Sequence, residues 1–129
     1  MQQHNQAADS CCVFEYMYRD AGNWKTHGAL LLTGKADGMS EVMKSYFESG
    51  GMFVAEQVGV PSLCMAHFAA CGDGPSDLDH AFHEFVRLRQ ATPEEIVGMP
   101  VVGALLAMLA RMRAAAGRWD VTLSPNSCL

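Results

Sequence analysis

Hydrophobic and polar residues alternate along this chain in short segments separated by glycine-rich turns, a pattern typical of small domains that mix strands and helices. Residues 12–19 (CVFEYMYR) and 24–33 (WKTHGALLLT) are rich in aromatic and β-favouring side chains, and an Asp-Ala-Gly-Asn turn cluster lies between them. They predict an antiparallel hairpin. Residues 52–58 and 82–90 predict a third and a fourth strand by the same criteria.

Two segments after the hairpin predict short helices. Ser40 can cap a helix that continues to Ser49, because the apolar residues between them fall on one helical face. Residues 62–71 predict another helix, since Pro61 suits its first position and Gly72 suits its end.

Residues 92–117 predict a helical C-terminal section. The Thr92-Pro93-Glu94-Glu95 motif has the residue types of a capping box with proline at the first helical position. After an interruption at Pro100, an alanine-rich helix is expected from about Val101 to Ala116. Its core-facing stripe would contain Val101, Leu105, Leu109 and Met112.

The predicted fold class is α+β, with one domain over residues 1–129. We expect a mostly antiparallel sheet of about four strands, one short helix after the first hairpin, and the helical section packed on one face of the sheet. Residues 1–11 are expected to form a flexible tail, and residues 119–123 either a final edge strand or a docked tail. Because half of the 129 residues are apolar, a single core can form without disulfides or metal.

Charge and composition exclude several classes of protein. The formal net charge of −5 argues against nucleic-acid binding, which needs a broad basic surface. The apolar, uncharged stretch from Ile96 to Ala110 contains a proline and is shorter than the ~20 apolar residues of a membrane span. The first ten residues lack the features of a secretory leader, and the five cysteines are an odd number. These features predict a soluble cytoplasmic protein with reduced thiols.

Three motifs together resemble a known group of proteins. They are Tyr18-Arg-Asp-Ala-Gly-Asn-Trp-Lys25, Ala55-Glu-Gln-Val-Gly-Val-Pro-Ser-Leu63 and Asp79-His-Ala-Phe-His-Glu-Phe85. The combination resembles a family of small uncharacterised bacterial proteins found among accessory or mobile genes. The resemblance implies a compact, strand-rich α+β domain and brings no activity to transfer. The chain departs from the family pattern in a longer segment at 63–77 and in its alanine-rich C-terminal section.

One segment has the residue types of a metal site. Asp79, His80, His83 and Glu84 lie within six residues, and each can bind a divalent ion such as zinc or move a proton. On a helix the two histidines would share a face, whereas on a strand they would point to opposite faces. In the alternative interpretation, the histidines bond to loop carbonyls or aspartates. The nearby Cys64-x-x-His67-x-x-x-Cys71 spacing could add ligands but matches no standard zinc pattern.

Two further sets of residues could have a functional role, one in acid–base catalysis and one in ligand binding. Acid–base catalysis could use His80 or His83 with Glu56 as a second group.

A ligand site could combine Arg19, Trp24, Lys25 and Glu56, because arginine binds anions and tryptophan stacks on rings. The structural alternative is an ion pair between Arg19 and an acid such as Glu56, which would tie the hairpin to the third strand.

No recognised catalytic motif occurs in the chain. We therefore expect a non-enzymatic binding or interaction module of bacterial origin that forms a homodimer, with a further protein partner possible and with no cofactor, no nucleic acid and no membrane. The alternative is a small metal-dependent or histidine–carboxylate enzyme that uses the Asp79-His80-x-x-His83-Glu84 segment.

Overall fold

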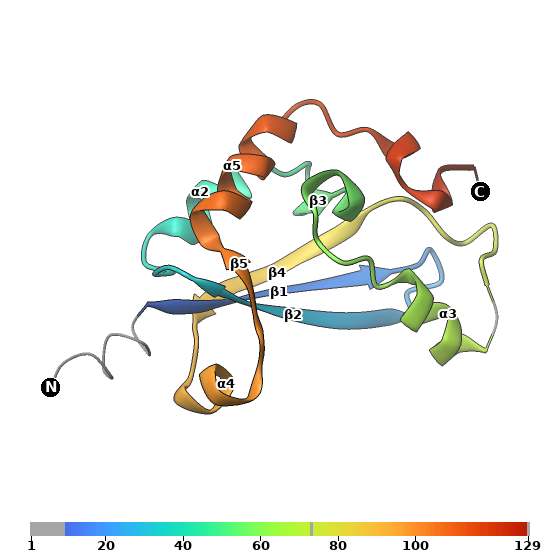
Figure 1. Ribbon diagram of the computed structural model, residues 1–129. Helices are drawn as coiled ribbons and strands as arrows, with labels where there is room; N and C mark the ends of the chain where they lie inside the picture. Colours follow the sequence, from blue (N-terminus) through green and yellow to red (C-terminus); the bar gives the residue numbers. More distant parts are fainter. Residues whose placement is uncertain (1–9, 73, 129) are drawn as a thin grey trace, which may run out of the picture.

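The aromatic and β-branched residues near the start of the chain form the central hairpin that the sequence predicts. The computed structural model describes residues 10–72 and 74–128 (Figure 1). In it, β1 (Cys11–Arg19) and β2 (Lys25–Thr33) pair antiparallel along their whole lengths. Asn23, in the connecting turn, has a φ of 71°, a conformation that asparagine adopts more readily than most other residues. Residues 1–9 of the predicted tail lie outside the described residues, and the prediction is wrong at Cys11, which belongs to β1 and is buried.

Three more strands complete a mixed sheet with the order β3-β4-β1-β2-β5. β3 (Met52–Phe53) pairs antiparallel with β4 (His83–Gln90), and β4 pairs antiparallel with β1. β5 (Val101–Ala104) is parallel to β2 and forms one edge. The predicted class, α+β with a mostly antiparallel sheet, is confirmed, with five strands in place of about four.

Helices cover the two faces of the sheet unequally. α2 (Met39–Lys44) and α5 (Leu105–Ala115) lie above it in Figure 1, whereas α4 (Pro93–Gly98) lies below one end. α3 (Cys64–Cys71) sits at the opposite end of the sheet, beside the start of β2. Among the described residues, no helix is long and apolar enough to cross a membrane.

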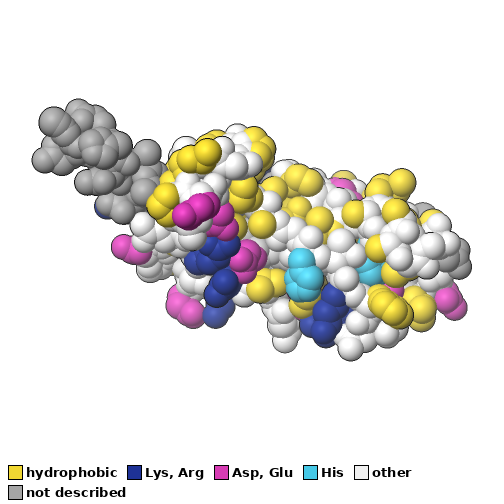
Figure 2. All heavy atoms as spheres, turned by 90° about the horizontal axis from the view of Figure 1, so that it is seen from below, with side chains coloured by type: hydrophobic (Ala, Val, Ile, Leu, Met, Phe, Trp, Pro, Cys, Tyr) yellow, Lys and Arg dark blue, Asp and Glu magenta, His cyan; other side chains and the backbone are white. Residues whose placement is uncertain are grey.

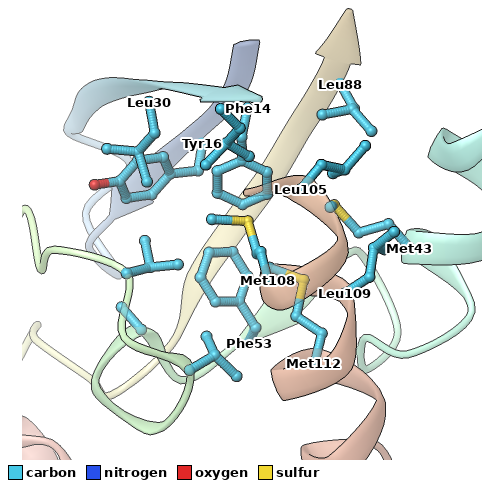
Figure 3. Packing of buried hydrophobic residues seen from close by; sticks show 14 of the residues in the cluster. Phe14, Tyr16, Leu30, Met43, Phe53, Leu88, Leu105, Met108, Leu109 and Met112 are labelled. Atoms are coloured by element: carbon cyan, nitrogen blue, oxygen red, sulfur yellow. The ribbon is translucent and has the colours of Figure 1, made fainter. Parts of the chain in front are cut away.

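The main core lies between the sheet and α5. Residues of even number in β1 face this side, as the two-residue period of a strand requires, and both Phe14 and Tyr16 are buried. Figure 3 shows α5 pressing its apolar side chains onto them, with Phe53 from β3 beside the helix. The buried residues of α5 are Leu105, Met108, Leu109, Met112 and Ala115.

Within the described residues, the opposite face of the sheet carries a smaller apolar cluster near α4, which contains Val13 and Leu31. Beyond it, charged residues pair across the strands, and Figure 2 shows acidic and basic side chains side by side on this face. Glu15 accepts hydrogen bonds from both Arg87 and Arg89. Arg89 also pairs with Glu95 at 2.6 Å. These two arginines are thus engaged by carboxylates of the protein itself.

The predicted capping box at the start of α4 is confirmed. The Thr92 hydroxyl accepts from the Glu95 backbone N–H, and the Glu95 carboxylate accepts from the Thr92 backbone N–H. Pro93 occupies the first helical position, where its missing N–H costs nothing.

The predicted third strand, 52–58, is wrong beyond Phe53. Ala55–Val58 forms a 3₁₀ helix, in which Ala55 and Val58 are buried while the residues between them are half-buried. Burial repeats every three residues here, which suits a 3₁₀ turn and not a strand.

The predicted helix over 101–116 starts too early. Val101 to Ala104 are extended and pair with the edge of β2, so the helix begins at Leu105 and Val101 does not belong to its buried stripe. The open edge of β2 offers hydrogen bonds to a β-branched segment, and this outweighs the helical spacing.

Smaller corrections concern element ends. Gly38, with a φ of 71°, is the N-cap of α2, so Ser40 is not, and the helix ends at Lys44 instead of Ser49. α3 begins at Cys64, after the predicted start, and ends at Gly72 as predicted. The segment expected to be an edge strand or docked tail contains a 3₁₀ turn, Val121–Leu123.

Candidate functional site

A pocket of about 320 Å³ opens where the β1–β2 turn, the end of α3 and the loop before β4 meet. The three segments that line it come together at the α3 end of the sheet, which Figure 1 shows. The side chains that line it include those of Asp20, Trp24, His67, Cys71 and Asp79. Aromatic, acidic and metal-ligating groups from three separate segments therefore face one space.

Asp20 is positioned by the hairpin turn that it closes. Its backbone N–H donates to the Trp24 carbonyl, and its Oδ1 accepts from the Trp24 backbone N–H at 3.1 Å. This is a common use of aspartate in turns, because the side chain replaces a missing backbone acceptor. The second carboxylate oxygen, Oδ2, is available to form a hydrogen bond with His67.

His67 joins the turn to α3. Its Nε2 lies 2.9 Å from Asp20 Oδ2, and its Nδ1 lies 2.8 Å from the Thr26 hydroxyl. The imidazole is almost fully buried, whereas Cys71, four residues later on the same helical face, is exposed. The Cys71 Sγ is 3.8 Å from His67 Nε2. The carboxylate of Asp20 and the thiol of Cys71 therefore both lie next to Nε2 of His67.

The electrostatics of the pocket favour negative charge on Asp20. The hydrogen bond with His67 lowers the pKa of Asp20 below its usual value, and the backbone N–H groups of Trp24 and Gly22 add to this effect. Asp79 accepts from the Tyr18 hydroxyl at 2.6 Å and from the Ser76 N–H at 2.9 Å. Burial and the bond to Asp79 raise the pKa of Tyr18, so its hydroxyl remains a donor.

The ligand atoms of Asp20, His67 and Cys71 all lie within 4.8 Å of one another. Within the described parts of the chain, this is the one group of three or more His, Cys, Asp or Glu side chains that meets this condition. A carboxylate, an imidazole and a thiolate are the three ligand types that zinc takes in proteins. The group faces the pocket, so a fourth coordination position would be accessible.

The structure does not bring the side chains of the predicted metal segment, residues 79–84, together at one site. Asp79 lines the pocket, but His80 donates from Nε2 to the Arg19 carbonyl at 2.7 Å and accepts at Nδ1 from the Phe82 N–H. Glu84 pairs with Arg19. His80 thus bonds to a backbone carbonyl, as in the alternative interpretation, but this carbonyl belongs to the last residue of β1 and not to a loop.

His83 lies inside the protein, away from solvent. It is 1 % exposed, and its Nε2 accepts from the backbone N–H of Leu63 at 3.0 Å. Burial lowers the pKa of His83 to about 4, so the ring is neutral at pH 7. The proton of this neutral ring therefore sits on Nδ1, which has no hydrogen-bond partner among the described residues.

The four residues expected to bind a ligand also separate. Arg19 pairs with Glu84 and not with Glu56. Trp24 is 69 % exposed at the rim of the pocket, and it is the member of the set that lines this space. Lys25 is exposed opposite Arg19 in the hairpin. The buried Oε1 of Glu56 has no hydrogen-bond partner within the described chain.

The sequence suggested His67 and Cys71 only as additional ligands, and it placed Asp20 in the hairpin turn beside Arg19, either as a turn former or as part of a ligand site. The spacing of His67 and Cys71 on a predicted helix was the available signal, because residues four apart share a helical face. Nothing in the sequence placed Asp20 beside them, since the contact joins positions 47 residues apart.

Comparison of the chain with known proteins finds no matching family model, no similar curated protein and no similar solved structure. The interpretation of the site therefore depends on its own geometry.

Proposed function

We propose that the protein binds a divalent metal ion of the zinc class through Asp20, His67 and Cys71 and presents it to the pocket. The observation that carries this proposal is the convergence of the three different donors at His67 Nε2, with all ligand atoms within 4.8 Å. This proposal agrees with the alternative expectation of a metal-dependent protein, but it assigns the ion to residues outside the 79–84 segment.

The observed spacing suits such an ion after a small adjustment. Zinc–ligand bonds of about 2.0–2.3 Å in a tetrahedral arrangement place ligand atoms about 3.3–3.6 Å apart. The distance of 3.8 Å between Cys71 Sγ and His67 Nε2 is close to this range. The 2.9 Å hydrogen bond between His67 and Asp20 would open by a few tenths of an ångström as the ion replaces the shared proton.

Thr26 would support the bound form. A histidine that binds metal through one ring nitrogen usually donates from the other to a nearby oxygen, which fixes the ring. The Thr26 hydroxyl, 2.8 Å from His67 Nδ1, is placed to accept this bond.

The charges of the donor set also match a divalent ion. Asp20 and the Cys71 thiolate together neutralise two positive charges. With three protein ligands and one open position, such an ion supplies a Lewis acid that can bind water or a small ligand. Because Cys71 is exposed and must stay reduced to bind, the proposal includes a location in the reducing cytoplasm.

Metal content tests the proposal directly. Untagged protein purified without chelators, then incubated with excess zinc and desalted, should contain about one equivalent by elemental mass spectrometry. Cys71→Ser and His67→Ala should each lower metal affinity at least about tenfold, because each removes one of three ligands. Cobalt-loaded protein should show thiolate-to-cobalt absorption that disappears in Cys71→Ser.

Two histidine variants provide matched controls. His27 is exposed on β2, outside the donor set, so His27→Ala should retain the metal. His80→Ala should also retain it. Metal-free wild-type protein would contradict the proposal, as would metal lost from His80→Ala and kept by Cys71→Ser. Since Cys71 is exposed, Cys71→Ser should fold even if His67→Ala does not.

We also propose that the protein forms a homodimer through β5. This strand is an edge of the sheet, and its residues are exposed along its whole length. Val101, Val102 and Leu106 expose half or more of their surface beside this edge. A second copy could extend the sheet by a two-fold pairing of edge strands and cover these side chains.

Leu106→Glu tests the dimer because Leu106 is 72 % exposed and its replacement leaves the core intact. Light scattering should show a dimer for the wild type and a monomer for Leu106→Glu. Met65→Glu, which charges an equally exposed residue of α3, should remain dimeric. A monomeric wild type, or equal behaviour of the two variants, would contradict the dimer.

A further inference from the structure

We infer that the pocket takes a small organic cation, a primary ammonium group carried on a single aromatic ring or a similar apolar body. This inference concerns the same pocket as the proposed metal site. It goes further by assigning the ligand to Asp79 and Trp24, neither of which belongs to the metal-binding set.

The charge of the pocket selects against anions. Asp20 and Asp79 both line it, whereas no Lys or Arg occurs among the described residues of its wall. Cys71 ends α3, so the partial negative charge of the helix C-terminus also lies at this space. With a divalent ion neutralised by Asp20 and Cys71, the Asp79 carboxylate remains as net negative charge. Apart from the metal ion, the pocket therefore offers no positive charge to a phosphate or carboxylate ligand. It does offer the negative charge of Asp79 to an ammonium group.

Asp79 is held in place as a receptor for that group. Its side chain is 8 % exposed, and each carboxylate oxygen already accepts one hydrogen bond, Oδ1 from Tyr18 and Oδ2 from Ser76. A carboxylate has about four acceptor positions, so both oxygens can accept further donors. The two existing bonds fix the orientation of the group before a ligand arrives, which reduces the entropy that binding costs.

The rim of the pocket offers an apolar surface for the ligand body. Trp24 is 69 % exposed and Leu78 is 46 % exposed, and both line the pocket. A hydrogen bond of 2.9 Å from the Ala21 N–H to the Leu78 carbonyl ties the hairpin turn to the loop that carries Leu78. The two exposed side chains are thereby held on one rim. A tryptophan face also attracts cations, which adds to the preference for an ammonium ligand.

The size of the pocket limits the body of the ligand. Its volume of about 320 Å³ is at the lower end of the ~300–1,000 Å³ that ligand pockets usually have, and the wall includes Phe68 and Ala70. A single ring with a short aminomethyl arm suits this space better than a nucleotide or a peptide does.

Three ring compounds of similar size and different charge test the inference. Isothermal calorimetry at pH 7 should show binding of benzylamine, at least about tenfold weaker binding of benzyl alcohol, and weaker binding of benzoate than of benzylamine. The experiment uses the full chain, and metal content is measured on the same samples. Benzoate that binds as well as benzylamine would overturn the inference, and so would the absence of benzylamine binding at millimolar concentration.

Two variants locate the interaction. Asp79→Asn should lower benzylamine affinity about tenfold or more, because a charge-assisted hydrogen bond is lost. Trp24→Ala should lower it about fivefold through loss of the ring face, and it leaves the fold intact because the side chain is exposed. The matched controls, Asp77→Asn in the same loop and Leu106→Ala on α5, should bind like the wild type. Unchanged affinity in Trp24→Ala would contradict the assignment even if Asp79→Asn fails to fold.

Metal content separates this inference from the proposed metal site. Asp79→Asn and Trp24→Ala should keep about one equivalent of metal while losing affinity for benzylamine. Protein that holds metal but does not bind benzylamine would overturn the ligand inference alone. Protein that binds benzylamine without holding metal would overturn the metal proposal alone.

Discussion

Replacement of Leu105 by alanine should lower the free energy of unfolding by about 3 kcal/mol, the usual cost of a leucine-sized cavity in a packed core. Leu105 is 1 % exposed in the first turn of α5 and belongs to the main core (Figure 3). A Cβ added at Gly34 would lie 3.0 Å from the Leu105 Cβ, so the backbone leaves little space to close around the cavity. Urea denaturation followed by circular dichroism measures the change.

The neighbouring leucine provides a matched control. Leu106 is 72 % exposed, so Leu106→Ala should change the free energy of unfolding by less than about 0.5 kcal/mol. A similar cost for the two variants would contradict the orientation of α5.

Acidification from pH 7 to pH 4.5 should destabilise the protein through His83. Burial lowers the pKa of His83 from 6.5 to about 4. Between these two pH values the unfolded chain binds a proton at His83 and the folded protein does not. Stability from this residue is complete above pH 6.5 and is lost as the pH falls to about 4. The difference corresponds to about 3 kcal/mol. Denaturation midpoints measured at intervals between pH 7 and pH 4.5 should therefore fall steadily.

A His83 variant tests whether His83 causes this pH dependence of stability. His83→Gln removes the titrating group and keeps a side-chain acceptor for the Leu63 N–H, so its stability should change little over the same interval. Glu95 does not interfere, because hydrogen bonds from Arg89 lower its pKa to about 2 and it titrates below its ordinary value of 4.5. An unchanged pH slope in His83→Gln would show that other groups cause the acid sensitivity.

The candidate site was only partly predictable because its residues come from distant positions. His67 and Cys71 share one face of α3, and helical spacing alone reveals that relation. Asp20 joins them only when the hairpin packs against α3, which no local pattern encodes. Conversely, Asp79 to Glu84 are adjacent in sequence but point toward different neighbours, since no helix places them on one face and β4 begins only at His83.

The sequence by itself determined the elements whose signals are local. The β1–β2 hairpin followed from β-favouring residues around a turn cluster, and the start of α4 followed from Thr92, Pro93 and Glu95. The cap of α4 joins residues of a single helical turn, and the hairpin pairing starts at the turn, where Arg19 faces Lys25. Local side-chain chemistry and backbone preference are then sufficient to choose the structure.

Tertiary structure decided the segments whose local preference is ambiguous. Residues 101–104 have helical spacing, yet they are extended because β2 offers an unpaired edge, and residues 55–58 turn because their apolar side chains reach the core at every third position. The convergence of Asp20, His67 and Cys71 arises in the same way. Contacts between distant residues exist only after the chain has folded, so their energy does not appear in any short stretch of sequence.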